Sequence, residues 1–528
     1  AQADPKFLEG WTSVVYPFAQ EDVSPTLHLA LYTLLAAVGF LLLIACANLA
    51  NLTLARATAR AHEIVVRLAL GATRSRIVSQ LVSESILVSA GGAALGLLLA
   101  GWCVKLMLAL EPPDIQRPEL IEINLAVFAF AAAASVLTIL LIGLVPSLGA
   151  SRADLNSALK AGGVRGGSAA RLRSRQFLIA AEVALALIMV TGAGLMLRSF
   201  HELISVGFGF ETSHLLVTDV EPPAKQYSDP AGRSRLFRQL LDRCRALPGV
   251  VDGAVVDMLP LHSVSMSNFY IAGQPEPPVS NVPIAEDVNM SPEYFQAIGL
   301  RLEAGRQFTD TDLAVAEKDG DKAAIVNQAF VRKFFSSENP LGKRLLSPDK
   351  KTASEIVGVV SDYRPLGVEN GTQPAIFWPY LKVSKATLVL RTKTDPQSMT
   401  KALQSAIWAM DKDLVLTETG PMEKFVDEWT SQRKFNTLLL GIFAGLALVL
   451  AMLGIYGVLS NLVASRTREI GIRMAIGASG VEIGKLVFRQ SMIPVTIGLA
   501  VGLAGSLVLS RFLEALLFQV HPRDPLTL

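Results

Sequence analysis

The stretch that decides the fold occurs twice, as RAHEIVVRLALGA at residues 60–72 and as RTREIGIRMAIGA at residues 466–478. Seven of these thirteen positions are identical, and most of the others exchange one apolar residue for another. Each copy follows one long apolar segment and precedes another, so the copies occupy equivalent places along the chain. A repeat of this kind indicates that the chain holds two versions of one module.

The segments around the repeat are long enough to cross a membrane, since a bilayer needs about 20 apolar residues per helix. The chain has 528 residues and is only 18% charged, whereas soluble proteins carry about 25% charged residues. Six apolar segments meet the required length: residues 23–55, 85–104, 123–151, 176–197, 436–465 and 490–510. We therefore expect a multi-pass α-helical membrane protein whose apolar helices contact the lipid bilayer. A net charge of +2 gives no reason to expect a nucleic-acid partner.

The basic residues of the connecting loops predict the orientation. Sixteen Lys and Arg residues lie in three loops, at 56–83, 148–175 and 464–489. Five lie in the stretches expected on the other side, at 1–27, 105–122 and 511–528. By the positive-inside rule the first set is cytoplasmic, and residues 199–434 then lie outside the cell membrane.

The repeated motif predicts a helix that ends in a tight turn. Each copy places a glutamate four residues before an arginine, the spacing of a helical ion pair: Glu63 with Arg67, and Glu469 with Arg473. A glycine follows in each copy, Gly71 and Gly477, where a positive φ would end the helix.

A second helix is expected to start directly after each turn. Thr73 and Ser479 stand where an N-cap would, and Ser479 has Glu482 three residues on, which is the pattern of a capping box. We expect a rigid helix–turn–helix along the cytoplasmic face. A plain connector is the alternative, but it would not need the same pattern twice.

The two copies are 406 residues apart, so some apolar segments around one copy have no counterpart around the other within the 528 residues. The counterpart of segment 123–151 would lie past the last residue, and that of segment 176–197 would lie before the first. We expect residues 1–27 to be the tail of a first extracytoplasmic domain, and both modules to be incomplete pieces of a longer duplicated protein. An asymmetric protein with six spans is the alternative.

The polar interval 199–434 is expected to fold as one α/β domain. HLLVTDV at 214–220, a helix over 233–250 and VDGAVVD predict strand, helix and strand. ATLVLR, a helix over 398–411 and DLVLTE repeat this order. Residues 266–384 are predicted to be an inserted subdomain, with one continuous irregular domain as the alternative.

The sequence carries no pattern that predicts catalysis. Its six histidines and three cysteines (Cys46, Cys103 and Cys244) lie far apart, which gives no reason to expect a metal or cofactor site. No stretch follows the G-x-x-x-x-G-K-[ST] pattern that holds nucleotide phosphates. We therefore expect no enzyme activity in these residues, and any ATP would be bound by a separate polypeptide.

Some residues inside the apolar segments are candidates for special roles. Glu182 is the one acidic residue within a span, so a coupling or proton role must be considered. The structural interpretation places it near the cytoplasmic start of its helix, where water and the helix dipole lower the cost of its charge. Asn48 and Asn51 are expected to form hydrogen bonds between helices. Six glycines are expected to allow close helix packing: Gly91, Gly92, Gly96, Gly498, Gly502 and Gly505.

Two long stretches around the repeat, ANLTLARATARAHEIVVRLALGATRSRIVSQLVSES and SNLVASRTREIGIRMAIGAS, resemble the permeases of the MacB/FtsX type of ABC transporter. EIVGVVSDYR and MSPEYFQAIGLRLEAGRQFT, together with the duplication, resemble its duplicated "orphan permease" branch. The resemblance covers nearly the whole chain. It implies two FtsX-like permease modules with a large extracytoplasmic domain, in the inner or plasma membrane.

The resemblance also implies a domain plan. The segments are a first module at 28–151 with coupling loop 56–83, a cytoplasmic linker at 152–175, a transmembrane helix at 176–198, a MacB-like periplasmic core domain at 199–434, and a second module at 435–528 with coupling loop 464–489. A complete module of the family has four helices. This chain departs from that pattern, since it lacks the first module's opening helix and domain and the second module's last helix.

By the same resemblance, the coupling loops would dock on a separate ABC ATPase and pass the energy of ATP hydrolysis to the extracytoplasmic domain, for efflux or mechanotransmission. The residues carried over are Arg60, Glu63, Arg67, Gly71 and Ala72 in the first loop and Arg466, Glu469, Arg473, Gly477 and Ala478 in the second. A periplasmic adaptor or an outer-membrane protein would be a further partner. The alternative function is an FtsX-like scaffold that regulates extracytoplasmic enzymes without transport; a secondary transporter is a third.

Overall fold

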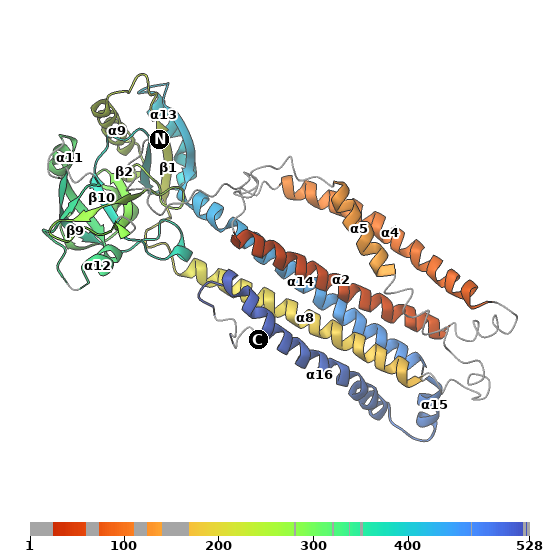
Figure 1. The fold of residues 1–528 in the computed structure, drawn as a ribbon. Helices are drawn as coiled ribbons and strands as arrows, with labels where there is room; N and C mark the ends of the chain where they lie inside the picture. The colour runs from red at the N-terminus through yellow and green to blue at the C-terminus, as the bar shows by residue number, and fades with distance from the viewer. Residues whose placement is uncertain are drawn as a thin grey trace. The chain divides into compact units, whose positions relative to one another are not determined.

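The computed structural model describes residues 25–59, 73–109, 124–139, 168–278, 281–318, 322–336, 338–348, 352–465, 467–520 and 524. These residues divide into two compact units (Figure 1). The α/β unit is Leu203–Thr430, and the helical unit consists of the described parts of Tyr16–Glu202 and Ser431–Leu528. The expected tail at residues 1–27 lies almost entirely outside the described residues.

Seven helices carry the described part of the helical unit. They are α2 (Pro25–Ala59), α4 (Arg74–Ala109), α5 (Leu125–Ile139), α8 (Ser168–Ser205), α14 (Met422–Ser465), α15 (Thr467–Ala475) and α16 (Gly480–Leu513), with a short 3₁₀ turn, η5 (Glu514–Leu516), after the last. Four stretches are long and apolar enough to cross a membrane: His28–Thr53, Arg173–Ser205, Met422–Asn461 and Gly480–Leu513. The two other predicted spans correspond to shorter apolar stretches, Ser89–Lys105 in α4 and Leu125–Val136 in α5.

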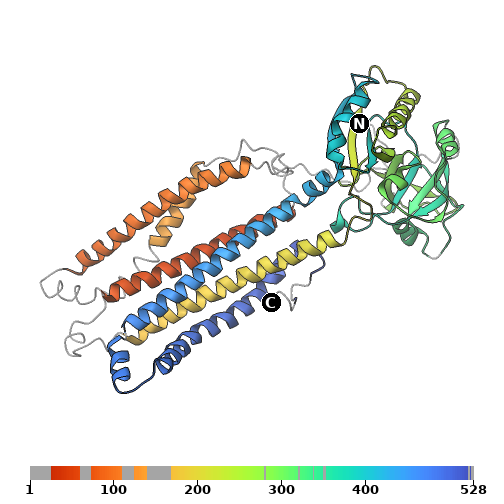
Figure 2. The ribbon, with the colours of Figure 1, turned by 180° about the vertical axis from the view of Figure 1, so that it is seen from behind.

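Three helices that are distant in sequence form the core of the helical unit. In both ribbon views α2, α8 and α14 run side by side (Figures 1 and 2). Their contact is built from small and apolar side chains: Ala37 and Ile44 from α2, Ala186 and Met189 from α8, and Leu440, Ala444, Ala447 and Ala451 from α14.

A glycine face on α16 brings this helix against α8. A methyl group at Gly498 would lie 2.6 Å from the carbonyl oxygen of Ala180, and one at Gly502 would lie 2.9 Å from Cα of Ala184. These two glycines, and Gly505, confirm the predicted close packing. Within the described residues the prediction fails for Gly91, Gly92 and Gly96, because no described atom lies within 4 Å of an added methyl group at any of them. Their face of α4 contacts no other described helix.

The α/β unit holds one sheet of twelve strands. They are β1 (Leu215–Glu221), β2 (Val250–Val256), β3 (Met266–Asn268), β4 (Tyr270–Ile271), β5 (Ile284–Met290), β6 (Leu302–Gly305), β7 (Lys322–Asn327), β8 (Arg344–Leu346), β9 (Ala353–Val360), β10 (Ala375–Pro379), β11 (Ala386–Thr392) and β12 (Val415–Pro421). The order is β12-β1-β11-β2-β5-β10-β7-β9-β8-β4, with β3 on β5 and β6 on β9. Between them lie α9 (Pro230–Arg245), α10 (Tyr294–Ile298), α11 (Asp310–Glu317), α12 (Gln328–Phe334), η4 (Val368–Asn370) and α13 (Pro396–Trp408).

The two predicted strand–helix–strand units are confirmed, and they interleave. Strands β12, β1, β11 and β2 pair antiparallel in that order. Strand β1 of the first unit therefore lies between β12 and β11 of the second unit, and β11 lies between β1 and β2 of the first. Both helices start alike, with an aspartate cap followed by proline: Asp229 and Pro230 for α9, and Asp395 and Pro396 for α13. Their apolar faces share one core over this part of the sheet.

The strands of the interval 266–384 continue the same sheet instead of forming a separate one. The path passes from β2 to β5 through the antiparallel pair Val256 and Met290. Beyond it, β10 lies between β5 and β7, and β7 pairs parallel to β9. Phe269, Phe330 and Ile356 belong to the separate core of this part.

Candidate functional site

The second repeat forms a sharp elbow, which we define as residues 467–483: α15, a four-residue turn, and the first turn of α16. Gly477 has a φ of +104°, which favours glycine, and this confirms its predicted place at the helix end. The amide of Ala478 donates to the carbonyl of Arg473 (2.9 Å) and that of Gly477 to the carbonyl of Met474 (3.0 Å). This pair of bonds is a Schellman motif, which satisfies carbonyls left free at the helix end.

Both sides of the elbow are reinforced locally. On α15 the guanidinium of Arg473 donates to Glu469 (2.6 Å), as the spacing predicted. On α16 the hydroxyl of Ser479 accepts from the amide of Glu482, while the Glu482 carboxylate accepts from the amide of Ser479. The predicted capping box is therefore confirmed. The Schellman hydrogen bonds, the ion pair and the capping box each join residues at most five positions apart, so the elbow's shape depends little on distant contacts.

The elbow leaves apolar side chains uncovered. Ile476 is 82% exposed, and three others on the two arms are more than half exposed: Ile472, Met474 and Val481. Exposed apolar side chains that lie together mark a surface that contacts a protein partner or the membrane.

The first repeat lies outside the described residues. This applies to Arg60, Glu63, Arg67, Gly71 and Ala72, and in the second copy to Arg466. The flanking residues keep the expected order, because α4 begins at Arg74 directly after Thr73, as α16 begins at Gly480 directly after Ser479.

A second candidate site lies inside the helical unit, around Glu182. The carboxylate is wholly enclosed, and its Oε1 accepts from Nδ2 of Asn51 on α2 (3.2 Å). Asn48, also on α2, donates to the backbone carbonyl of Leu450 on α14 (2.8 Å). Both asparagines thus form the predicted bonds between helices.

The predicted surroundings of Glu182 were wrong. We expected it near the start of its helix, close to water, but α8 begins at Ser168, about four turns earlier. The field of a helix end acts within its first turn, so it does not reach this carboxylate. No sequence signal linked Glu182 to Asn51, because these residues are 131 positions apart.

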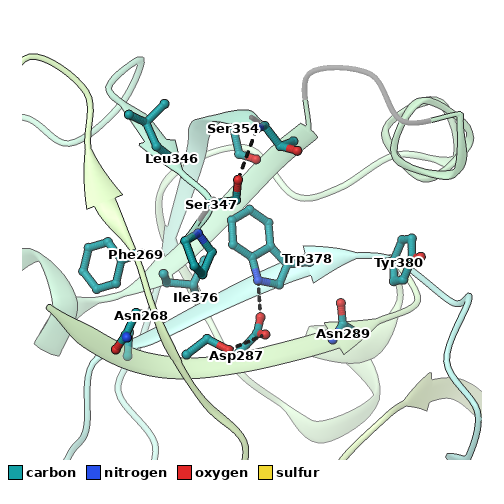
Figure 3. A pocket seen from close by; sticks show the side chains of 14 residues that line it. Asn268, Phe269, Asp287, Asn289, Leu346, Ser347, Ser354, Ile376, Trp378 and Tyr380 are labelled. Atoms are coloured by element: carbon teal, nitrogen blue, oxygen red, sulfur yellow. Dashed lines mark hydrogen bonds between the residues drawn. The ribbon is translucent and has the colours of Figure 1, made fainter. Parts of the chain in front are cut away.

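The α/β unit contains a shallow pocket of about 270 Å³ beside β3, β5 and β10. Figure 3 shows Trp378 and Asp287 within it, where the indole N–H donates to the carboxylate. Ser267 donates to the other oxygen of Asp287 (3.0 Å). Both oxygens of this carboxylate are therefore occupied by the protein.

Two carboxyl groups of this sheet are withdrawn from water: Glu286, on β5, is buried, and Asp257, directly after β2, is partly buried. Burial raises the pKa of Glu286 to about 7, against a hydrogen bond from Tyr363 that lowers it. Burial also raises the pKa of Asp257 to about 6, although Asn289 donates to both of its oxygens. These groups change charge near neutral pH. The sequence marked Glu286 only as one of many carboxylates.

Comparison with known families matches both halves of this architecture. The profile described as FtsX-like permease C-terminal matches residues 35–155 and again residues 441–524. The profile described as MacB-like periplasmic core domain matches residues 177–408. The chain belongs to the MacB/FtsX-type permease family. The two FtsX-like segments contain the two repeats, which confirms the predicted pair of modules.

Individual relatives of this MacB/FtsX-type permease match part of it. The macrolide export ATP-binding/permease protein MacB of Aggregatibacter actinomycetemcomitans is 25% identical over 228 residues, which are 41% of this chain and 33% of that protein. The protein of the same name from Neisseria meningitidis serogroup A is 28% identical over 237 residues, 42% of this chain and 35% of that protein. The match thus spans about a third of the length of these relatives.

Among solved structures, the periplasmic region of MacB from Actinobacillus actinomycetemcomitans is similar to this permease with a TM-score of 0.29 and 14% identity. That match covers 42% of this chain and 93% of the solved one.

Proposed function

We propose that this permease couples ATP hydrolysis by a separate ABC ATPase to movement of its extracytoplasmic α/β unit. The work done would be efflux or mechanotransmission, in the inner or plasma membrane, with a periplasmic adaptor or an outer-membrane protein as a further partner. The observation that carries the proposal is the elbow. It is braced by its own hydrogen bonds and presents exposed apolar side chains on a loop rich in basic residues.

A mechanical role suits the helices that leave the elbow. Helix α16 runs without a break for 34 residues from Gly480, which at 1.5 Å per residue is about 50 Å. Helix α14 contributes Met422 and Phe425 to the core of the α/β unit, and Ala444 and Ala447 to that of the helical unit. Both units therefore contain residues of α14, which supports the proposed transmission of movement between them.

The test is co-purification of the full-length gene product with candidate ATP-binding subunits. Replacing both repeat glycines, as Gly71→Val with Gly477→Val, forces a branched side chain where Gly477 has a positive φ. We expect the ATPase to bind the unchanged protein and to be lost from this double variant.

Gly471→Ala is the matched control. Gly471 lies inside α15 with no atom within 4 Å of an added methyl group, so alanine fits there and binding should persist. Equal binding by all three proteins would refute the elbow as the docking site. Absence of any ATPase, with binding to extracytoplasmic enzymes retained, would favour the scaffold function instead.

A further inference from the structure

The buried polar cluster of the helical unit holds more acceptor oxygens than donors. It consists of Glu182 on α8, Asn48 and Asn51 on α2, and Gly454 on α14. Among the described atoms, three buried oxygens lack a hydrogen-bond partner: Oε2 of Glu182, Oδ1 of Asn48 and Oδ1 of Asn51. Buried polar atoms are normally satisfied, so the imbalance requires an explanation.

The orientation of the Asn48 amide follows from its partner. The group it contacts is the carbonyl of Leu450, which can only accept, so the nitrogen of Asn48 must face it. Oδ1 of Asn48 then faces the other way, toward Gly454. An added methyl group at Gly454 would contact both this oxygen and Oε2 of Glu182. Two acceptors without donors therefore lie beside the same glycine.

No positive charge compensates the carboxylate within the described residues. Arg175, two turns away on α8, donates to Asn461. The titratable side chains that the structure describes on the packed helices are His28, Tyr32 and Cys46 on α2, Arg433, Lys434 and Tyr456 in the membrane part of α14, and Glu482, Lys485, Arg489 and Arg511 on α16. None of these described side chains forms a hydrogen bond or an ion pair with Glu182, whose described polar partner is Asn51. An ionised carboxylate enclosed without a counter-ion is costly.

We propose that Glu182 and Asn48 form a proton-binding site between α8, α2 and α14. A proton taken from water forms an O–H bond at Oε2, and this hydroxyl donates to Oδ1 of Asn48. Loss of the proton to water leaves two acceptors facing each other and one negative charge enclosed. That state favours separation of the three helices, so the site links proton binding to their packing.

This inference goes beyond the proposed function, since it needs neither the ATPase nor the elbow. It explains why α14 carries glycine at position 454. A Cβ at this position would lie closer to Oδ1 of Asn48 and to Oε2 of Glu182 than either oxygen permits.

The direct test is infrared spectroscopy of the purified full-length protein at neutral pH. A protonated carboxyl group has a C=O band separate from that of a carboxylate, and the band shifts in heavy water. We expect such a band in the unchanged protein and its loss in Glu182→Gln. Glu286→Gln is the control for the buried acid of the α/β unit, and it should leave the Glu182 band in place. A spectrum in which Glu182→Gln removes no protonated band would overturn the proposal.

Thermal unfolding in detergent provides the second readout. Glu182→Gln should keep the melting temperature, because its amide can donate to Asn48 as the hydroxyl does, while Glu182→Ala should lower it. Gly454→Ala should also lower it, and Gly457→Ala, where no atom lies within 4 Å, should not. A rise in the melting temperature on adding sodium or potassium, absent from Glu182→Gln, would identify a metal-cation site and reject the proton.

Discussion

At the scale of single residues, the chain places carboxyl groups where water cannot reach them. Glu286 is 4% exposed on β5, and one of its oxygens has no partner among the described atoms. Its neighbours in the core include Tyr294 and Tyr363, whose own pKa values burial raises well above the ordinary range. A neutral acid fits this environment better than an ionised one.

The pKa of Glu286 predicts how the stability of the α/β unit depends on pH. Its folded pKa of about 7 is above the ordinary value of 4.5, so the folded state binds more protons between these two values. Stability is therefore fully present below about pH 4.5 and is lost as pH rises through 7. The expected loss from this group is on the order of 3 kcal/mol.

The measurement is the melting temperature of the protein and of Glu286→Gln at pH 5 and pH 8. We expect the melting temperature of the unchanged protein to fall between these values. The variant should show a smaller fall, because of these two acids of the α/β unit only Asp257, with its pKa of about 6, still contributes. An identical fall in both proteins would contradict the assignment to Glu286.

At the scale of elements, the elbow shows how few residues are needed to join two helices at a sharp angle. Gly477 is the glycine of the Schellman motif that ends α15, and Ser479 is the N-cap residue of α16. A single residue, Ala478, separates these two capping residues. The amide of Ile483 bonds to the backbone carbonyl of Ser479 (3.2 Å), which continues the first turn. The rigidity of the elbow thus depends on the capping residue.

Replacing Ser479 with alanine is expected to loosen the start of α16. Loss of a capping side chain costs about 1 kcal/mol, which corresponds to roughly fivefold faster local opening. The measurement is hydrogen–deuterium exchange of the amides at residues 482–484 in the full-length protein. Ser479→Asp retains an acceptor oxygen and should exchange like the unchanged protein. If alanine and aspartate give the same rates, the capping box does not stabilise this turn.

At the scale of the whole molecule, the sidedness of the two units follows from the distribution of Lys and Arg. The elbow belongs to a loop with five basic residues and is expected in the cytoplasm, with the α/β unit on the opposite side. Lys225 of the α/β unit and Lys485 of α16 are both exposed, so they are suitable positions for testing this topology.

Cysteine labelling checks the predicted topology in spheroplasts. Cys46 and Cys244 are buried and Cys103 is exposed, so Cys103→Ser gives a background with low reactivity. A maleimide that cannot cross membranes should label Lys225→Cys in intact spheroplasts, and Lys485→Cys only after permeabilisation. Labelling of both positions before permeabilisation would show that the topology is wrong.

Much of the architecture could be predicted because it depends on neighbouring residues. The caps at Ser479 and Asp229 use atoms within three positions, and the apolar segments are recognisable by length alone. The glycines could not be interpreted in the same way. Gly498 and Gly96 have similar apolar surroundings in sequence, yet only Gly498 has a helix against it.

The sequence by itself determined the apolar segments, the elbow of the second repeat and the strand–helix–strand units, since hydropathy, capping and turn formation act over a few residues. Only the tertiary structure decided that Glu182 meets Asn51 across 131 positions and that Asn48 reaches Leu450 across 402. It also decided that the strands of 266–384 extend the same sheet through Val256 and Met290. These contacts depend on which helix faces pack and which strands pair, and no local pattern records that choice.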